Sequence, residues 1–266
     1  GPSTGPTTTT IAKAAIANPK LNFGIIDSMA DPDNTGKPAS TNIKPLLFDT
    51  AQAAYLGGYA AAAWSAQSGA NKVGTFGGMK IPPVTIFMDG YVDGVKKYNE
   101  DKGANVAVVG WDKDKQDGSF TGAFQANDVA KQTANSVLDQ GVDPILPVGG
   151  PIYLSASAAI KDSGKKTVML GVDSDLAVAD PSVADQILVS IMKRIDDAVY
   201  TTVTETAKGS FDATPYVGTL ENNGVGLSSF HDFESKLPKG LTDELKALQE
   251  KIVKGEIKVD SPSSPK

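Results

Sequence analysis

The chain has 266 residues, of which 40% are hydrophobic and 21% charged, a composition that excludes a wholly disordered or fibrous protein. At about 150 residues per domain, this length predicts about two lobes. The formal net charge of −6 provides no overall basic field that would attract nucleic acid or an anionic membrane.

Short runs of β-branched residues alternate with longer amphipathic segments, which is the pattern of an α/β fold. The short runs predict strands at residues 22–27, 72–76, 105–111, 144–148, 166–172 and 185–191. The longer segments predict helices at 9–17, 50–68, 84–102, 124–139, 155–161 and 194–208. Several strands are apolar at consecutive positions, as in a parallel sheet that is covered on both faces. The pattern therefore predicts doubly wound parallel sheets, with more crossovers than one small sheet would use.

The pattern changes after residue 211. Residues 216–227 are glycine-rich and extended, residues 241–253 predict an amphipathic helix, and residues 255–259 predict a last short strand. The final segment, DSPSSPK at 260–266, is polar and broken by proline, so we expect a flexible tail.

Several kinds of chemistry fit the sequence poorly. There is no cysteine, and His231 is the only histidine, so no disulfide and no cysteine–histidine zinc site can form. No nucleophile-elbow motif is present, and we interpret His231 as a structural or surface residue. The acidic loop at 112–118 has Gln116 where a calcium loop needs a carboxylate, so a solvated turn is favoured. These patterns predict no metal and no cofactor.

The arginine content points to the charge of a ligand. Arg194 is the only arginine among the 25 basic residues. Arginine binds phosphates and carboxylates through two parallel hydrogen bonds. We therefore expect a ligand that is uncharged or weakly charged.

Polar and aromatic residues follow the ends of the predicted strands, where open α/β sheets bind their ligands. They lie at position 27, at 77–78, at 111–120, at 149–151 and at 173–175. Each group alone fits a loop cap or a turn, but together they outline the mouth of a cleft. Aspartates there can accept hydroxyl groups, as from a ribose, and aromatics such as Phe120 or Tyr153 can stack on a flat ring.

Eight short motifs along the chain resemble those of one protein family. They are VGTFGGM at 73–79, FMDGYVDG at 87–94, FDTAQAAYL at 48–56, GVDSD at 171–175, MKRID at 192–196, GVGL at 224–227, HDF at 231–233 and GEI at 255–257. Over residues 9–259 the chain resembles the basic membrane protein family of substrate-binding lipoproteins. This family serves ABC importers and includes the purine nucleoside receptor A group.

The resemblance implies a type I periplasmic-binding fold, in which two doubly wound α/β lobes are joined by a hinge of three crossovers. Mapped onto this chain, lobe 1 comprises residues 1–80 and 176–212, and lobe 2 comprises residues 81–175 and 213–259. Residues 260–266 remain a flexible tail. The ligand is expected between the lobes, which close on it.

The resemblance also implies a function and its residues. The protein would be a non-enzymatic, extracytoplasmic component that captures purine nucleosides for the permease subunits of an ABC importer. It would be a lipoprotein whose lipid anchor lies outside this chain. Asp173 resembles the ribose-binding aspartate, and Lys193 the lysine that reaches the cleft from lobe 1. Phe120 is the candidate for stacking on the base, Tyr153 is a weaker candidate, and Asp49 is a further contact.

One departure from the family concerns lobe 1. Family members begin with a strand and an acidic, glycine-containing motif that ends in Ser-Phe-Asn, and no such motif precedes Thr9. We expect lobe 1 to lack its first units, which would leave a half-built cleft and an exposed sheet edge prone to pairing.

Other functions remain open at this point. The same fold with a sugar or another small polar ligand is one alternative, because aromatic side chains stack on pyranose rings as well as on purines. A sensory binding protein is a second. A hydrolase that uses Asp173 and Asp175 for acid–base chemistry is a third.

Overall fold

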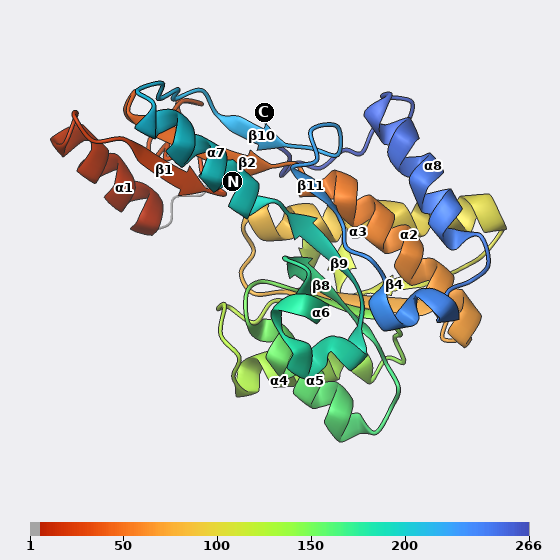
Figure 1. Ribbon diagram of the computed structural model, residues 1–266. Helices are drawn as coiled ribbons and strands as arrows, with labels where there is room; N and C mark the ends of the chain where they lie inside the picture. Colours follow the sequence, from red (N-terminus) through yellow and green to blue (C-terminus); the bar gives the residue numbers. More distant parts are fainter. Residues whose placement is uncertain (1–5, 266) are drawn as a thin grey trace.

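The structure is a computed structural model that describes residues 6–265. Its main body is an α/β arrangement around two separate sheets, seen at the upper left and in the centre of Figure 1. Residues 1–5 of the predicted lobe 1 and residue 266 of the predicted tail lie outside the described residues.

The small lobe, residues 6–48 and 194–218, contains a three-stranded parallel sheet. Its strand order is β1 (Phe23–Ile26), β2 (Ile43–Phe48) and β10 (Tyr216–Gly218). Two helices pack against this sheet: α1 (Pro6–Ala17) contacts β1, and α7 (Ile195–Ala207) contacts β1 and β2. Strand β1 lies at the edge of the sheet, and no further strand pairs with it among residues 6–265.

The large lobe, residues 49–193 and 219–259, contains a six-stranded sheet. Its order is β11 (Val225–Leu227), β9 (Ile187–Lys193), β8 (Met169–Asp173), β7 (Ile145–Val148), β3 (Lys72–Gly77) and β4 (Ala107–Val109). All neighbours are parallel except β11, which pairs antiparallel with β9. A short hairpin of β5 (Trp111–Asp112) and β6 (Asp117–Gly118) follows β4.

Helices cover both faces of the large sheet, so its strands are buried on each side. Helices α2 (Thr50–Ser68), α3 (Pro82–Lys102) and α8 (Leu241–Val253) form one core with the sheet. Helices α4 (Asp128–Leu138) and α5 (Ile152–Ser163) form the other, next to the short α6 (Leu176–Ala179) and η1 (Pro181–Gln186). Along β3, Val73 points into the first core and Phe76 into the second. The consecutive apolar residues of this strand are explained by these two cores.

Helices α2 and α3 pack closely because glycine faces backbone at their contact. A Cβ on Gly94 would lie 1.9 Å from the carbonyl oxygen of Tyr55, and one on Gly58 would lie 2.1 Å from that of Tyr91. No side chain fits at such a distance, so the sequence must place glycine at both positions. A Cβ on Gly90 would lie 2.3 Å from the carbonyl oxygen of Ala51, so the first turn of α2 packs against the middle of α3.

The predicted α/β class and most predicted elements are confirmed. The helices expected at 50–68 and 241–253 have those same bounds. Two local predictions are wrong: residues 255–259 form no strand, and β2 (Ile43–Phe48) was not expected. The apolar run of β2 contains Pro45, which obscured its strand character.

The strand partners correct the predicted division into lobes. Strands β3 and β9, expected in lobe 1, pair within the large sheet, and β10, expected in lobe 2, pairs with β2 of the small sheet. The chain passes between the sheets three times, after β2, after β9 and after β10. Which sheet a strand joins depends on partners far away in the sequence, and local patterns do not report these partners.

The C-terminal segment also differs from its prediction. Residues 260–265 lie against the large lobe and the start of α2, where Ser261 is 5% exposed and donates a hydrogen bond to Asp89. The short serine and proline side chains fit between elements, and buried hydrogen bonds hold them there. The segment is therefore part of the packed structure rather than a free tail.

Two negative findings apply to residues 6–265. No helix there combines the length and the apolar character that a membrane span requires. Within the same range, no cluster of histidine, cysteine and carboxylate side chains is arranged to hold a metal ion.

Candidate functional site

Three charged side chains meet between the two sheets. Lys193 is the last residue of β9, and its side chain is 3% exposed. Its Nζ lies 2.7 Å from Oδ2 of Asp27, which follows β1, and 3.3 Å from Oδ1 of Asp173, which ends β8. This ion triad (Asp27, Asp173 and Lys193) therefore joins the carboxyl ends of strands from both lobes.

Both aspartates lie where the backbone turns sharply. Asp27 has φ 58° and Asp173 has φ 69°, in the left-handed region that residues other than glycine rarely adopt. Aspartate is among the residues that tolerate this conformation best. The turn ends each strand at the residue that carries the carboxylate.

The environment of the triad controls its charge. Burial disfavours the charged form of Lys193, but the carboxylates of Asp173 and Asp27 outweigh it and raise the pKa of the lysine. The Phe87 ring, whose centroid is 5.1 Å from Nζ, adds a cation–π contact. Burial raises the pKa of Asp27, although the ammonium of Lys193 opposes this rise. With both aspartates ionised, two negative charges and one positive charge leave the triad at −1.

The carboxylates remain available to a ligand. The side chain of Asp27 is 28% exposed and that of Asp173 is 41% exposed, whereas Lys193 is enclosed. The lysine thus orients the two carboxylates, and their outer oxygens can accept hydrogen bonds from hydroxyl groups.

A cavity of 760 Å³ adjoins the triad at Asp27. One wall is the small-lobe segment from Asp27 to Gly36, and the other is the start of α3 with Gln116 and the C-terminal segment. The lining residues are Asp27, Ser28, Met29, Asp31, Asn34, Gly36, Leu47, Phe48, Lys80, Ile81, Pro82, Pro83, Thr85, Ile86, Gln116 and Pro262 to Pro265. A ligand in this cavity would contact both lobes.

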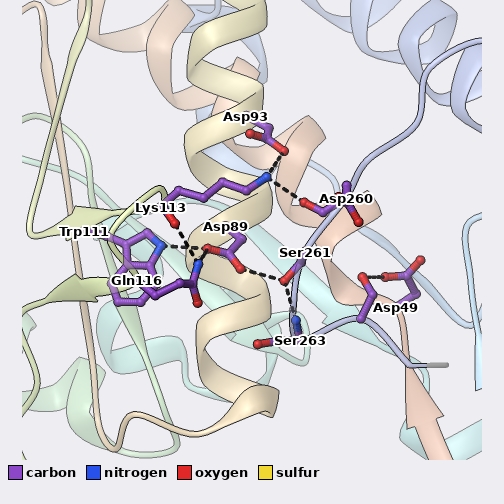
Figure 2. A network of polar contacts seen from close by, with 10 residues as sticks. Asp49, Asp89, Asp93, Trp111, Lys113, Gln116, Asp260, Ser261 and Ser263 are labelled. Carbon is purple, nitrogen blue, oxygen red and sulfur yellow. Dashed lines mark hydrogen bonds and ion pairs between the residues drawn. The ribbon is translucent and has the colours of Figure 1, made fainter. Parts of the chain in front are cut away.

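The C-terminal segment reaches this wall through a network of polar contacts (Figure 2). Ser261 donates to Asp89 of α3 over 2.6 Å, and Lys113 donates to the carbonyl oxygen of Asp260 over 2.6 Å. Ser264 donates to the carboxylate of Asp49 over 2.8 Å. The segment is thus tied both to α3 and to the first crossover between the lobes.

Among the predicted site residues, Asp173 and Lys193 lie together, and Phe120 is at the same edge of the large sheet. Phe120 is half-buried, and its ring meets Trp111 edge-on with centroids 5.8 Å apart. It packs on Gly77 at the end of β3, where a Cβ would lie 2.7 Å from the ring. Strand β3 is two strands from β8, roughly 10 Å at the usual spacing.

The other two predicted residues make different contacts. The carboxylate of Asp49 accepts from Gln52 and Ser264, and burial raises its pKa. The hydroxyl of Tyr153 donates to Asp180 over 2.8 Å, and burial followed by this hydrogen bond raises the pKa of Tyr153 to about 12. None of the five predicted site residues lines the cavity, which borders the triad through Asp27 alone.

Two residues near the strand ends, Asp27 and Phe124, are not among the predicted site residues. Asp27 was recognised only as a strand-end residue, although its position after an apolar run was the available signal. The sequence predicts Phe124 in the first turn of a helix, but α4 begins at Asp128 after the capping side chain of Asn127. The Phe124 ring lies over Gly78 and Gly149, where a Cβ would be 2.4 and 2.7 Å from it, and the residue is 37% exposed.

The contacts of His231 bear on the hydrolase alternative. Its Nε2 lies 2.8 Å from Oδ2 of Asp175 and 3.2 Å from the hydroxyl of Ser229. A catalytic relay needs the acid and the nucleophile on different ring nitrogens, and here both contact the same one. Asp175 pairs with His231 while Asp173 pairs with Lys193, so the two carboxylates do not work on a common group.

Comparisons with known proteins agree with this architecture. The family model described as ABC transporter substrate-binding protein PnrA-like matches residues 7–263. Basic membrane protein B of Borreliella afzelii is 29% identical over 246 residues, which are 91% of this chain and 63% of that protein. The ABC transporter nucleoside-binding protein BmpA of Lactococcus lactis is 28% identical over 260 residues, 93% of this chain and 67% of that protein.

A solved structure shares the fold. The ABC transporter solute-binding protein of Aeropyrum pernix has a TM-score of 0.77 at 26% identity, over 97% of this chain and 76% of that chain. This likeness confirms the predicted periplasmic-binding fold. The chain spans 62 to 63% of the length of the basic membrane proteins B that it matches. The chain therefore belongs to the PnrA-like family of ABC transporter substrate-binding proteins.

Proposed function

We propose that this protein captures a purine nucleoside between its two lobes and presents it to the permease of an ABC importer. The observation that carries the proposal is the ion triad, in which one buried lysine holds a carboxylate from each lobe at the strand ends. Family membership supports the transport role, and the nucleoside-binding relative supports the choice of ligand.

The triad would bind the ribose. Vicinal hydroxyl groups donate to the outer oxygens of Asp173 and Asp27, while Lys193 keeps both carboxylates oriented. Because the two carboxylates belong to different lobes, a ribose held by both favours the closed arrangement of the lobes.

The base would stack on an aromatic side chain of the large lobe. The Phe124 ring is 37% exposed over Gly78 and Gly149, which follow β3 and β7, and the Phe120 ring packs on Gly77 at the end of β3. Stacking of a base on an aromatic ring contributes about 1–3 kcal/mol.

The charge of the site favours nucleosides over nucleotides. The triad has two carboxyl groups and one ammonium group, and Arg194, the only arginine, pairs with Asp197 over 2.8 Å. A phosphate would meet carboxylates without a guanidinium to neutralise it. We further propose that the protein is extracytoplasmic and membrane-bound through a lipid anchor, as family resemblance implies. Its role is capture, and the arrangement of His231 supports no hydrolytic relay.

Titration calorimetry tests the proposal. The wild type is titrated with inosine, guanosine and adenosine, with ribose and galactose as sugar probes, and with inosine monophosphate as a charged probe. We expect binding of at least one nucleoside, weaker binding of the monophosphate, and loss of binding in Asp173→Asn. The exposed Asp185→Asn is the matched control. Binding of a sugar in the absence of nucleoside binding would replace the proposal with the sugar alternative.

A further inference from the structure

Asp89 is a buried carboxylate that accepts three hydrogen bonds, one of them from Gln116 of the cavity wall. It lies on α3 and is 0% exposed. Its Oδ1 accepts from Nε1 of Trp111 and from Nε2 of Gln116, each over 2.9 Å, and its Oδ2 accepts from Ser261. The amide nitrogen of Gln116 is therefore turned toward Asp89.

A second contact holds the same amide group. Nε2 of Gln116 also donates to the carbonyl oxygen of Lys113 over 2.9 Å, so both of its N–H groups are used. The backbone of Gln116 has φ 51° in the tight turn between β5 and β6. Rotating the amide by 180° would lose both bonds and place its oxygen against a carboxylate. Figure 2 shows the nitrogen of Gln116 turned to Asp89 and its oxygen on the opposite side.

The orientation leaves the amide oxygen as the group that Gln116 can offer a ligand. Gln116 is half-buried and lines the 760 Å³ cavity. Its hairpin follows β4, and β3 and β7 separate that strand from the Asp173 end of β8. Asp27 of the triad and Gln116 line the same cavity, so a nucleoside whose ribose binds at Asp27 can extend its base through that cavity toward Gln116.

We propose that Gln116 is a specificity-determining residue whose amide oxygen accepts an N–H group from the base edge, with Asp89 as its positioning residue. The inference rests on the proposed nucleoside function. Inosine and guanosine carry N–H at ring position 1, and adenosine carries an exocyclic N–H at position 6. Purine riboside has no N–H donor at this edge. A buried acceptor left without its donor weakens binding by about 10- to 100-fold.

The test compares inosine with purine riboside by calorimetry in four proteins. The wild type is expected to bind inosine about 10- to 100-fold more tightly than purine riboside. In Gln116→Leu the two affinities should lie within about 3-fold of each other. Gln125→Leu replaces an exposed glutamine of the following loop, and it should keep the wild-type preference.

Asp89→Leu is the fourth protein, and it tests the positioning role. Leucine accepts no hydrogen bond, so the amide of Gln116 keeps only its bond to the carbonyl oxygen of Lys113 and can turn an N–H group toward the acceptor at position 1 of purine riboside. The affinity for inosine should fall while the affinity for purine riboside is unchanged or rises, whereas loss of structure would weaken the binding of both. If this variant does not fold, Gln116→Leu on the surface hairpin still decides the question.

The outcomes separate the two proposals. An unchanged inosine preference in Gln116→Leu overturns the inference and leaves the proposed function standing. If Gln116→Leu instead changes discrimination between inosine and 2′- or 3′-deoxyinosine, the residue reads the sugar and the inference is wrong. Absence of nucleoside binding in the wild type would remove the proposed function itself.

Discussion

The two lobes contribute unequally to the site and to the stability of the protein. The large lobe has a six-stranded sheet with a core on each face, and it supplies Lys193, Asp173 and Gln116. The small lobe has three strands around a core of Ala15, Ile25, Ala30 and Ile43, and it supplies Asp27 and one cavity wall. The large lobe is thus packed more extensively than the small lobe.

The exposed surface supports the same distinction. Apolar side chains of α1, β1 and α7 are exposed, among them Ile16 at 61%, Ile26 at 41% and Tyr200 at 73%. A lobe that buries little apolar surface opens at a low free energy. We therefore expect ligand binding to change the small lobe most.

The largest effect is expected from breaking the charge link between the lobes. Lys193→Met leaves Asp27 and Asp173 facing each other without their cation. Breaking a buried ion pair in this way costs about 3–5 kcal/mol, and we expect nucleoside binding to be lost as well. Urea unfolding and calorimetry measure both effects, and the exposed Lys254→Met is the control. Unchanged stability would mean that the triad does not couple the lobes.

Matched cavity mutations compare the two cores directly. Ile145 of β7 and Ile43 of β2 are both 0% exposed, so replacing either by alanine should cost about 2–4 kcal/mol locally. Hydrogen exchange should show that Ile145→Ala lowers the protection of the whole large sheet. Ile43→Ala should lower protection in β1, β2 and β10 alone. Equal effects on both sheets would show that the lobes unfold as one unit.

The aromatic contact is expected to contribute less. Phe124→Ala should weaken nucleoside binding by about 1–3 kcal/mol, because an exposed ring at the strand ends is lost. Tyr153→Phe removes a hydroxyl that is already bonded to Asp180, and it should leave the affinity unchanged. Calorimetry with the preferred nucleoside ranks Phe124→Ala against Phe120→Ala. A larger loss in Phe120→Ala would restore the sequence-based choice.

The smallest expected effect is on the pH dependence of stability. Because the pKa of Asp27 is raised in the folded state, the folded protein holds this proton more tightly than the unfolded chain does. The contribution of Asp27 to stability is therefore present below the unfolded value of 3.8 and is lost as the pH rises through the folded pKa. Asp27→Asn should remove this loss. Urea unfolding from about pH 3.5 to 7 measures the free energy of unfolding of the wild type and of Asp27→Asn. The same pH dependence in both proteins would contradict the raised pKa of Asp27.

Part of the candidate site could be predicted from the sequence. Asp173 and Lys193 were selected through the motifs GVDSD and MKRID, and the structure places them 3.3 Å apart. Their roles in binding remain predictions. Asp27 and Gln116 were not selected, because a strand-end aspartate and a glutamine in an acidic turn have no distinctive local pattern. Their importance comes from what packs on them: Lys193, 166 residues from Asp27, and Asp89, 27 residues from Gln116.

The sequence by itself determined the elements whose signals are local. Helix α2 has its predicted bounds because an alanine-rich run ends at Gly69, which adopts φ 81° as a helix cap. Only the tertiary structure decided which sheet each strand joins, that residues 260–265 pack against α3, and that one lysine holds carboxylates of both lobes. Periodicity and capping act over a few residues, whereas strand pairing and ion pairing join residues that are distant in the chain. Strand pairing and ion pairing of this kind stabilise the chain only once distant segments have come together in the folded state.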